Sequence, residues 1–398
     1  MMEPRFSRRG FLVGAGGATA LGAGGVAFDG AHAPAAAQEG GLPDYAAWKD
    51  ADALIIHSRN TMETKRGAVG SGGLTASDRL FIRNNLPSPD ASITADPDAW
   101  EIAIEGVARP GTMTLGQLKR LGVTSEASVL QCSGNGRGFF THGASGSQWL
   151  TGAAGCVIWT GVPVAAIVEA MGGPAEGATL MTSTGGETLP DGVDPASIMV
   201  ERSVPIAAHA HAMIAFEMNG APLPLTHGGP ARVVIPGYYG VNNVKYVKRL
   251  AFGTQESGAK IQTSGYRVRP VGEGGAASQP SMWDMTVKSW VTHPLTDPGS
   301  GRVQIHGVAF AGPERASGVA VSLDGGQSWE QARFYGPDLG RFAWRSFVME
   351  ADLAPGVYAV ASRATAEGGS VQPEDFPPNE RGYGHNGWRA HAVELTVA

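Results

Sequence analysis

Apolar and polar positions of the first two thirds of the chain follow both strand and helix periods. Residues 99–106 alternate between apolar and polar side chains, which is typical of a half-buried strand. Residues 114–121 carry apolar side chains at helical spacing, and Thr114 is placed to cap the helix. Residues 231–236 form an apolar run that ends at a proline, which predicts a buried strand. The pattern therefore predicts a domain of mixed helices and strands over residues 38–280.

The pattern changes in the last third of the chain. Residues 256–285 are polar and rich in glycine, as expected of a loop and linker. Short apolar strands then recur at regular intervals, at 302–310, 318–323, 329–334, 344–349, 357–365 and 390–397. Asp324-Gly325-Gly326 lies between two of them as a hairpin turn. This spacing predicts an immunoglobulin-like β-sandwich over residues 281–398 and makes the whole chain α+β.

Composition and charge narrow the class of protein. The 398 residues include 58 glycines and 26 prolines, yet 42% are hydrophobic, which indicates a loop-rich, β-rich globular protein. The formal net charge is -6, and the basic residues form no stripe along the sequence. A nucleic acid is therefore not an expected partner.

The N-terminus has the pattern of an export signal. Ser7-Arg8-Arg9-Gly10 precedes a mildly apolar stretch and a run of small residues at 35–37. We interpret residues 1–37 as a twin-arginine signal peptide, so the mature protein is expected in the periplasm. No other run approaches the roughly 20 apolar residues that a membrane-spanning helix needs. The twin-arginine route carries folded proteins, often with a cofactor already inserted.

Two cysteines limit the redox chemistry that the chain can perform. Cys132 and Cys156 cannot supply the C-x-x-C-H motif of a c-type haem or four thiolates for an iron–sulfur cluster. Cys132 is followed by three alternate glycines, which would let the backbone approach a large cofactor, and by Arg137, which would favour the thiolate. The residues alone leave two alternatives open, a buried small hydrophobe and one periplasmic disulfide.

Several long motifs in a consistent order resemble the sulfite oxidase family. VLQCSGNGRGFF (129–140) and WLTGAAGCVIWTGVP (149–163) resemble its molybdenum-binding segment, and residues 215–250 resemble its pterin-binding stretch. VSLDGGQSWEQA (321–332) and residues 371–395 resemble its C-terminal dimerisation domain. The resemblance runs from about residue 78 to the C-terminus. It implies a mixed α/β domain that binds a molybdenum–molybdopterin cofactor, followed by an immunoglobulin-like domain, with no haem in this chain.

The resemblance assigns roles to individual positions. Cys132 matches the thiolate that ligates molybdenum, and three arginines match the substrate-binding ones: Arg83, Arg137 and Arg381. Trp149 and Tyr266 match aromatic residues of the pocket, although either could be an ordinary wall residue. The positions that hold the molybdopterin and its phosphate correspond to Ser203, His227, Arg232 and Lys245. Asn85, in the same pocket motif, stands where sulfite oxidases usually have histidine. Cys156 has no such match and is expected to pack as a small hydrophobe.

The resemblance implies oxidation of sulfite to sulfate, with electrons passed to a separate c-type cytochrome and dimerisation through the sandwich domains. Two related functions stay open. One is the sulfane dehydrogenase subunit of a sulfur-oxidising complex. The other is a periplasmic methionine-sulfoxide reductase, which has asparagine at the position of Asn85 but lacks the C-terminal sandwich. A non-enzyme alternative is a secreted immunoglobulin-like binding protein whose two cysteines form a disulfide.

Overall fold

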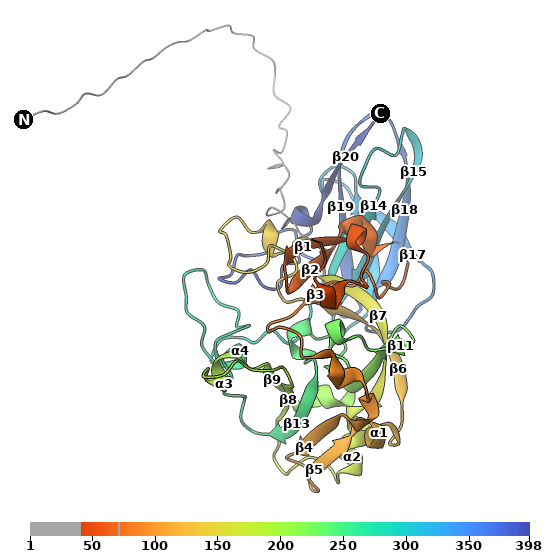
Figure 1. The fold of residues 1–398 in the computed structure, drawn as a ribbon. Coiled ribbons are helices and arrows are strands. Elements are labelled where there is room, and N and C mark those ends of the chain that lie inside the picture. Colours follow the sequence, from red (N-terminus) through yellow and green to blue (C-terminus); the bar gives the residue numbers. More distant parts are fainter. Residues whose placement is uncertain (1–40, 71) are drawn as a thin grey trace, which may run out of the picture. The chain divides into compact units, whose positions relative to one another are not determined.

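The computed structural model describes residues 41–70 and 72–398 (Figure 1). The export segment expected over residues 1–37 lies outside the described residues. Within the described part of the chain, no helix is both long enough and apolar enough to cross a membrane.

A small antiparallel sheet near the N-terminus positions the first functional arginine. Its strands, in spatial order, are β1 (Leu54–Ser58), β2 (Thr61–Thr64) and β3 (Ile82–Arg83). Met62 pairs with Ile82, and both side chains are fully buried in a local apolar cluster. Thr61 pairs with Arg83 in the same register. The burial of Ile82 therefore fixes where the next side chain, Arg83, leaves the sheet.

Two five-stranded sheets form the rest of the first domain. One sheet has the order β11-β10-β7-β6, and β12 also pairs with β10. The other has the order β5-β4-β13-β8-β9, in which β13 and β4 are parallel. The bounds are β4 (Glu101–Glu105), β5 (Gly111–Thr114), β6 (Thr124–Gln131), β7 (Ala154–Pro163), β8 (Leu180–Gly185), β9 (Glu201–Pro205), β10 (Met213–Met218), β11 (Ala221–Pro222), β12 (Arg232–Val234) and β13 (Val247–Gly253). The predicted strands at 99–106 and 231–236 correspond to β4 and β12.

The α-helices of this domain are short. They are α1 (Leu115–Lys119), α2 (Val164–Ala170), α3 (Pro195–Ile198) and α4 (Lys260–Thr263). The predicted cap of α1 is present, because Thr114 Oγ1 accepts from Gln117 N and Gln117 Oε1 accepts from Thr114 N. Leu115 and Leu118 of α1 are fully buried, so the helical spacing read from the sequence places its apolar face on the core.

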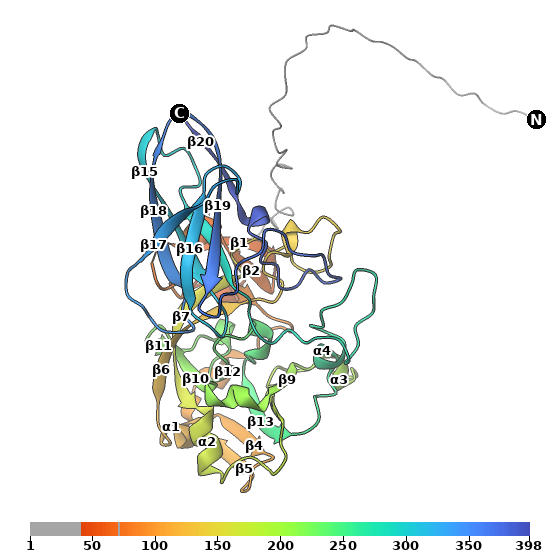
Figure 2. The same cartoon turned by 180° about the vertical axis from the view of Figure 1, so that it is seen from behind.

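The C-terminal domain is entirely antiparallel. Its seven strands have the order β14-β15-β18-β17-β16-β19-β20 (Figure 2). Their bounds are β14 (Lys288–His293), β15 (Gly301–Phe310), β16 (Ala316–Ser322), β17 (Glu330–Tyr335), β18 (Arg345–Leu353), β19 (Gly356–Ala366) and β20 (Val393–Val397). The sheet folds over itself, because Ser289 Oγ of β14 lies 3.0 Å from Ser362 Oγ of β19. Apolar side chains of the two layers form one core. An α+β chain that ends in a β-sandwich is thereby confirmed.

Hydrogen bonds of two largely buried cations join the C-terminal domain to the first domain. Lys288 Nζ, at the start of β14, donates to the carbonyl oxygens of Asn135 (3.3 Å) and His385 (2.7 Å). Burial lowers the pKa of Lys288 to about 7. Arg66 donates to the carbonyl oxygens of Val291 and His391, at 2.7 and 2.6 Å. Such buried donors cost free energy unless they are paired, so these contacts fix the two domains against each other.

Candidate functional site

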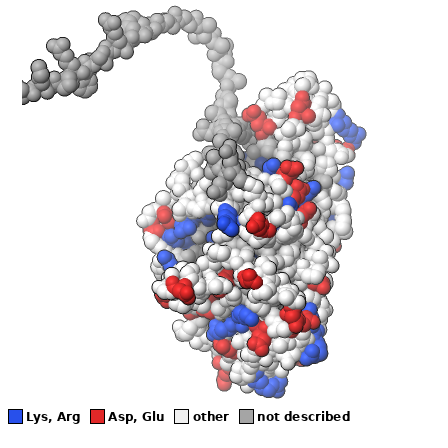
Figure 3. All heavy atoms as spheres, in the orientation of Figure 1, with Lys and Arg blue, Asp and Glu red and all other residues white. Residues whose placement is uncertain are grey.

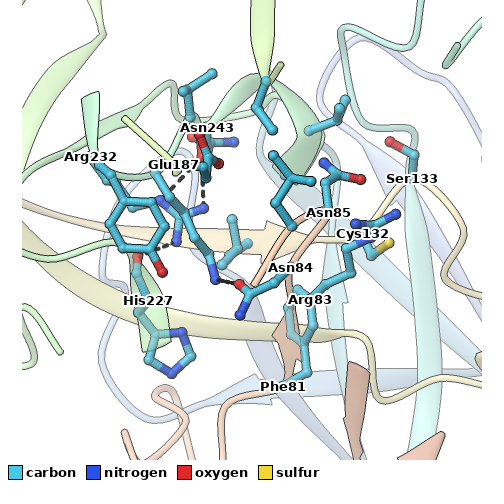
Figure 4. A pocket seen from close by; sticks show the side chains of 18 of the residues that line it. Phe81, Arg83, Asn84, Asn85, Cys132, Ser133, Glu187, His227, Arg232 and Asn243 are labelled. Atoms are coloured by element: carbon cyan, nitrogen blue, oxygen red, sulfur yellow. Dashed lines mark hydrogen bonds between the residues drawn. The ribbon is translucent and has the colours of Figure 1, made fainter. Parts of the chain in front are cut away.

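A pocket opens where the end of β3, the turn after β6 and the loops around β12 meet. Seven of the residues that the resemblance singles out line it: Arg83, Asn85, Cys132, His227, Arg232, Lys245 and Tyr266. Figure 4 shows that Arg83 and Cys132 lie together at one end, and Arg232 and His227 at the other. The pocket therefore has a thiol end and a cationic end.

The turn after β6 holds the thiol in place. Cys132 N donates to the carbonyl oxygen of Ala153 at 2.9 Å, and Asn135 N donates to the carbonyl oxygen of Cys132 at 2.9 Å. Cys132 is a free thiol and is 8% exposed. Because both backbone groups of Cys132 are paired, the direction of its side chain into the pocket is set by the fold.

Two arginines lie near this thiol. Burial acts against the charge of Arg83, but its electrostatic interactions with Tyr266, Cys132 and Tyr383 act in the opposite direction, and its pKa is raised. Burial lowers the pKa of Arg137, and its electrostatic interaction with Cys132 acts in the opposite direction. Both guanidinium groups therefore interact electrostatically with the same sulfur atom. They give this end of the pocket a positive field that suits a small anion.

The third arginine comes from the C-terminal domain. Arg137 Nε donates to the carbonyl oxygen of Arg381 at 2.7 Å, and Arg137 Nη1 donates to that of Ser147 at 2.9 Å. The Nε atom of Arg381 is buried and has no hydrogen-bond partner among the described residues. A buried guanidinium N–H without a partner is costly, so this donor suits an anionic acceptor that the protein itself does not provide.

Two stacked tyrosines lie beside the arginines. The rings of Tyr266 and Tyr383 are 5.2 Å apart and nearly parallel, and the Arg137 guanidinium lies 5.5 Å from the ring of Tyr383. Tyr383 is 4% exposed, and burial raises its pKa to about 12. Sequence reasoning missed Tyr383, although it lies only two positions after Arg381. A tyrosine in a glycine-rich loop carries no signal of its own, so its proximity to Arg381 was the available clue.

The other end of the pocket gathers cations. Arg232 donates from Nη1 to the carbonyl oxygen of His227 at 2.9 Å and from Nη2 to that of Asn243 at 2.8 Å. Lys245 Nζ donates to Asn84 Oδ1 and to the carbonyl oxygen of Thr226. Burial lowers the pKa of Arg232 to about 10, and burial and Arg232 lower that of Lys245. Cations clustered this closely are stabilised by an anion such as a phosphate.

A half-buried carboxyl group accompanies these cations. Glu187 lines the pocket, and burial raises its pKa to about 7 while Lys245 acts in the opposite direction. Asn84 and Asn243 line the same wall. No sequence motif singles out Glu187, Asn84 or Asn243. Glu187 follows two glycines in a polar loop, and nothing in that pattern separates it from the other glutamates of the chain.

Four assigned residues are not among those that line the pocket: Arg137, Arg381, Trp149 and Ser203. Trp149 is 1% exposed, and its ring packs edge-on against those of His57 at 4.8 Å and Phe81 at 6.4 Å. It therefore supports Phe81, which does line the pocket. Ser203 is fully buried in β9, where its Oγ lies 2.7 Å from Thr182 Oγ1 and accepts from Ser257 N at 2.9 Å. The expected direct contacts of Trp149 and Ser203 with a bound group are not supported by this geometry.

Two of the glycines after Cys132 are closely approached by the protein's own side chains. A Cβ at Gly134 would lie 2.4 Å from Arg137 Nη2, and one at Gly136 would lie 2.8 Å from His385 Cβ. Gly136 also has φ +96°, a conformation that favours glycine. These glycines therefore make room for the protein's own side chains, and their function is to let Arg137 and His385 pack closely.

The disulfide alternative is also excluded. Both cysteines are free thiols. Cys156 pairs with Val129 in the β6–β7 ladder, whereas Cys132 lies three positions further along, opposite Ala153. Three residues of extended strand span about 10 Å, which exceeds the reach of a disulfide. Cys156 is fully buried, and burial raises its pKa to about 12, so it packs as the small hydrophobe that the sequence predicted.

The donor set of the pocket fits a molybdenum–molybdopterin group. Cys132 offers one soft sulfur ligand, the kind of donor that suits a transition metal. The hydroxyl of Ser133 next to it is buried and has no hydrogen-bond partner within the described part of the chain. Arg232, Lys245 and His227 at the other end suit the phosphate and polar edge of the pterin.

Comparisons with known proteins agree with this geometry. Residues 88–261 match the family model "Oxidoreductase molybdopterin binding domain", and residues 279–397 match "Mo-co oxidoreductase dimerisation domain". Chicken sulfite oxidase (Gallus gallus) is 30% identical over 337 residues, which cover 79% of this chain and 72% of that protein. Human mitochondrial sulfite oxidase is 31% identical over 351 residues, covering 82% of this chain.

The solved structure of the sulfane dehydrogenase SoxCD from Paracoccus pantotrophus is similar too. It matches with a TM-score of 0.69 and 26% identity, over 85% of this chain and 86% of that chain. The present chain spans only 62% of the length of the mitochondrial sulfite oxidases of man and of Macaca fascicularis. The matched domains and the chicken relative show that the chain belongs to the sulfite oxidase family of molybdopterin-binding oxidoreductases.

Proposed function

We propose that the protein is a periplasmic sulfite dehydrogenase that oxidises sulfite to sulfate and passes the electrons to a separate c-type cytochrome. The observation that carries this proposal is the gathering of Arg83 and Arg137 near a single thiol, Cys132, with Arg381 held against Arg137 from the C-terminal domain. Sulfite is a small oxyanion, and arginine groups bind such oxygens through paired charge-assisted hydrogen bonds.

The roles of the side chains follow from their positions. The bound molybdenum–molybdopterin group supplies the two-electron oxidation, in which sulfite and water give sulfate, two protons and two electrons. Cys132 holds the metal through its sulfur atom. Arg83 and Arg137 hold sulfite oxygens and orient its sulfur atom, and Arg381 completes the site from the C-terminal domain. Tyr266, stacked on Tyr383, limits the freedom of the substrate from the side.

A direct assay tests the proposal. Purified protein that contains molybdenum is mixed with sulfite, thiosulfate or methionine sulfoxide, with ferricytochrome c as the acceptor for the first two and a reduced dye as donor for the third. We expect sulfite to be oxidised with two cytochrome molecules reduced per sulfate formed. Reduction of methionine sulfoxide without sulfite oxidation would contradict the proposal.

A sulfane dehydrogenase is the second candidate. The structural match to SoxCD covers 86% of that chain, whereas the chain covers 62% of the mitochondrial sulfite oxidases, so the domain content resembles SoxCD at least as well. Its substrate would be sulfane sulfur bound to a carrier protein, which is bulkier than sulfite, so the two candidates can be told apart by their turnover rates with the two substrates. A turnover rate with a persulfidated carrier that exceeds the rate with sulfite would favour this candidate.

Export and assembly belong to the same proposal. Ser7-Arg8-Arg9 supports export by the twin-arginine route, and replacing both arginines by lysine should leave the protein in the cytoplasm. The match to a dimerisation domain over residues 279–397 supports a homodimer, which sedimentation at micromolar concentration tests. On the face shown in Figure 3, acidic and basic side chains are interspersed, and the net charge of -6 suits a basic cytochrome.

A further inference from the structure

A buried lysine reaches the pocket from the N-terminal segment. Lys49 is 5% exposed and lies between two short 3-10 helices, Asp44–Ala46 and Ala51–Ala53. Its Nζ atom lies 2.6 Å from the carbonyl oxygen of Ser77, 2.7 Å from that of Leu80, and 2.7 Å from Nε2 of His227. His227 is the histidine that lines the cationic end of the pocket.

We propose that Lys49 is a positioning residue for the cofactor: it donates to His227 Nε2 and thereby fixes the tautomer of His227 that carries its proton on Nδ1. The cofactor assignment is the part of the proposed function on which this inference rests. The identity of the oxidised substrate does not enter it.

A protonated Lys49 supplies one donor to each of its three neighbours. An ammonium group has three N–H donors and no acceptor. Two of these donors are used by the carbonyl oxygens of Ser77 and Leu80, which can only accept. The third then points to His227 Nε2, which must accept through its lone pair. In the competing arrangement a neutral Lys49 amine donates to the two carbonyl oxygens and accepts a hydrogen bond from Nε2–H, which requires the opposite tautomer of His227. Burial, which lowers the pKa of Lys49 to about 7, acts in favour of this neutral form.

The surroundings of His227 keep its ring neutral. His227 is 1% exposed, and burial together with the charges of Lys49, Lys245 and Arg232 lowers its pKa well below the ordinary value. A neutral imidazole has one N–H donor, and the hydrogen bond made by one ring nitrogen decides which nitrogen carries it. With Nε2 accepting from Lys49, Nδ1–H becomes the donor that the ring offers to an anionic oxygen of the bound group.

An aromatic contact restrains the lysine as well. Lys49 Nζ lies 4.4 Å from the ring centroid of Trp48, and the Trp48 ring packs edge-on against that of His227 at 6.0 Å. The three side chains thus form one packed group, in which the ammonium group has little room to turn away from Nε2. Such a fixed partner is what a histidine needs to keep one ring orientation.

This residue lies upstream of the segments that carry the family match. The matched molybdopterin-binding domain begins at residue 88, and the sequence resemblance begins at about residue 78. The same N-terminal segment is anchored in the C-terminal domain by Arg66, which donates to the carbonyl oxygens of Val291 and His391. Two cations of this segment therefore make long-range contacts. Lys49 contacts His227 at the cationic end of the pocket, and Arg66 contacts the C-terminal domain.

The tautomer can be measured directly in the wild-type holoenzyme. Histidine labelled with ¹⁵N at both ring nitrogens is observed by long-range ¹H–¹⁵N correlation, and the His227→Gln variant identifies the His227 signals. We expect a protonated Nδ1 and an unprotonated, hydrogen-bonded Nε2. A protonated Nε2, or a doubly protonated ring, overturns the proposal. This experiment needs no variant of Lys49, so a folding defect cannot obscure it.

A pair of variants then tests the consequence for the cofactor. Lys49→Met keeps the length of the side chain but removes its donors, and Lys65→Met is a matched control because Lys65 is an exposed lysine of the same segment. We expect Lys49→Met to lose molybdenum and pterin about tenfold faster on dialysis and to show a changed His227 tautomer. Metal analysis and the fluorescence of the oxidised pterin measure the loss, and the control should match the wild type.

The outcomes separate this inference from the proposed function. Retention equal to wild type in Lys49→Met, with His227 still protonated on Nδ1, would show that Lys49 does not position the ring. The opposite result is also distinguishable. If the wild type has Nδ1 of His227 protonated and Lys49→Met loses the cofactor rapidly, this inference holds even when the wild type does not oxidise sulfite. Only the substrate assignment would then be removed.

Discussion

Arg137 Nε donates to the backbone carbonyl oxygen of Arg381 at 2.7 Å, across 244 positions of the chain. A main-chain atom of the C-terminal domain thus holds a side chain of the first domain. The glycine after Arg381 is part of the same contact, because a Cβ at Gly382 would lie 2.8 Å from Arg137 Cγ. The position of Arg137, beside the thiol end of the pocket, therefore depends on the folding of both domains.

This contact allows the side chain of Arg381 to be tested without displacing Arg137. Arg381→Gln keeps the carbonyl oxygen that Arg137 uses and removes the guanidinium. We expect kcat/KM for sulfite to fall by about 10- to 150-fold, which corresponds to one charge-assisted hydrogen bond of roughly 1.5–3 kcal/mol. Arg389→Gln, at an exposed arginine of the same loop that pairs with Glu374, is the control and should leave kcat/KM unchanged. An unchanged value for Arg381→Gln would place this side chain outside the substrate site.

The two cysteines should respond very differently to replacement by serine. Cys132→Ser exchanges a soft sulfur donor for a poor one, so we expect loss of sulfite oxidation in a protein that still folds. Cys156→Ser changes a fully buried side chain in β7, so we expect activity to remain and the free energy of unfolding to fall by about 1–3 kcal/mol. Steady-state assays and thermal unfolding of both variants measure this. Equal inactivation of the two variants would contradict the assignment of Cys132 as the metal ligand.

Asn85 lines the pocket at a position where sulfite oxidases usually have histidine. An amide cannot change its charge, whereas a histidine titrates near pH 6.5. We therefore expect Asn85→His to add an ionisation to the pH dependence of kcat, shifted below pH 6.5 because Arg83 nearby disfavours a further positive charge. Sulfite itself titrates near neutrality, so wild type and variant are compared in the same buffers. Superimposable profiles from pH 5 to 9, with sulfite still oxidised, would rule out this role for position 85.

Buried histidines near the domain interface predict acid sensitivity. Burial and Lys288 lower the pKa of His385 to about 3 and that of His391 well below its ordinary value. Both rings are thus neutral in the folded protein, whereas an unfolded histidine takes up a proton below about pH 6.5. The unfolded state then binds more protons, so the free energy of unfolding should fall as the pH drops from 6.5 towards 4.

A histidine variant measures the size of that effect. His385→Gln removes one of the two titrations and should make the acid slope shallower by about 1.4 kcal/mol per pH unit between pH 6 and 4. His211→Gln, at an exposed histidine, should leave the slope unchanged. Urea unfolding at a series of pH values gives both slopes. Equal slopes for wild type and His385→Gln would show that this ring does not control the acid stability.

Local patterns in the sequence determined those structural features that depend on residues close together in the chain. The cap of α1 depends on Thr114 and Gln117, three positions apart, and both of its hydrogen bonds are present. The regular apolar strands after residue 300 are present as β15 to β20, because a strand that buries one face must alternate along its own length. The motif around Cys132 also predicted a residue of the thiol end of the pocket. This was possible because the preference of a metal depends on the type of its donor atom, and the sequence gives that type directly.

Only the tertiary structure decided which distant groups meet. The contact of Lys49 with His227 spans 178 positions and that of Arg137 with Arg381 spans 244, and no local pattern encodes such pairs. The same limit applies to Ser203 and Trp149, whose side chains are buried and do not line the pocket. It also explains the glycines after Cys132. A glycine shows that something approaches the backbone, but packing decides that at Gly134 the neighbour is Arg137.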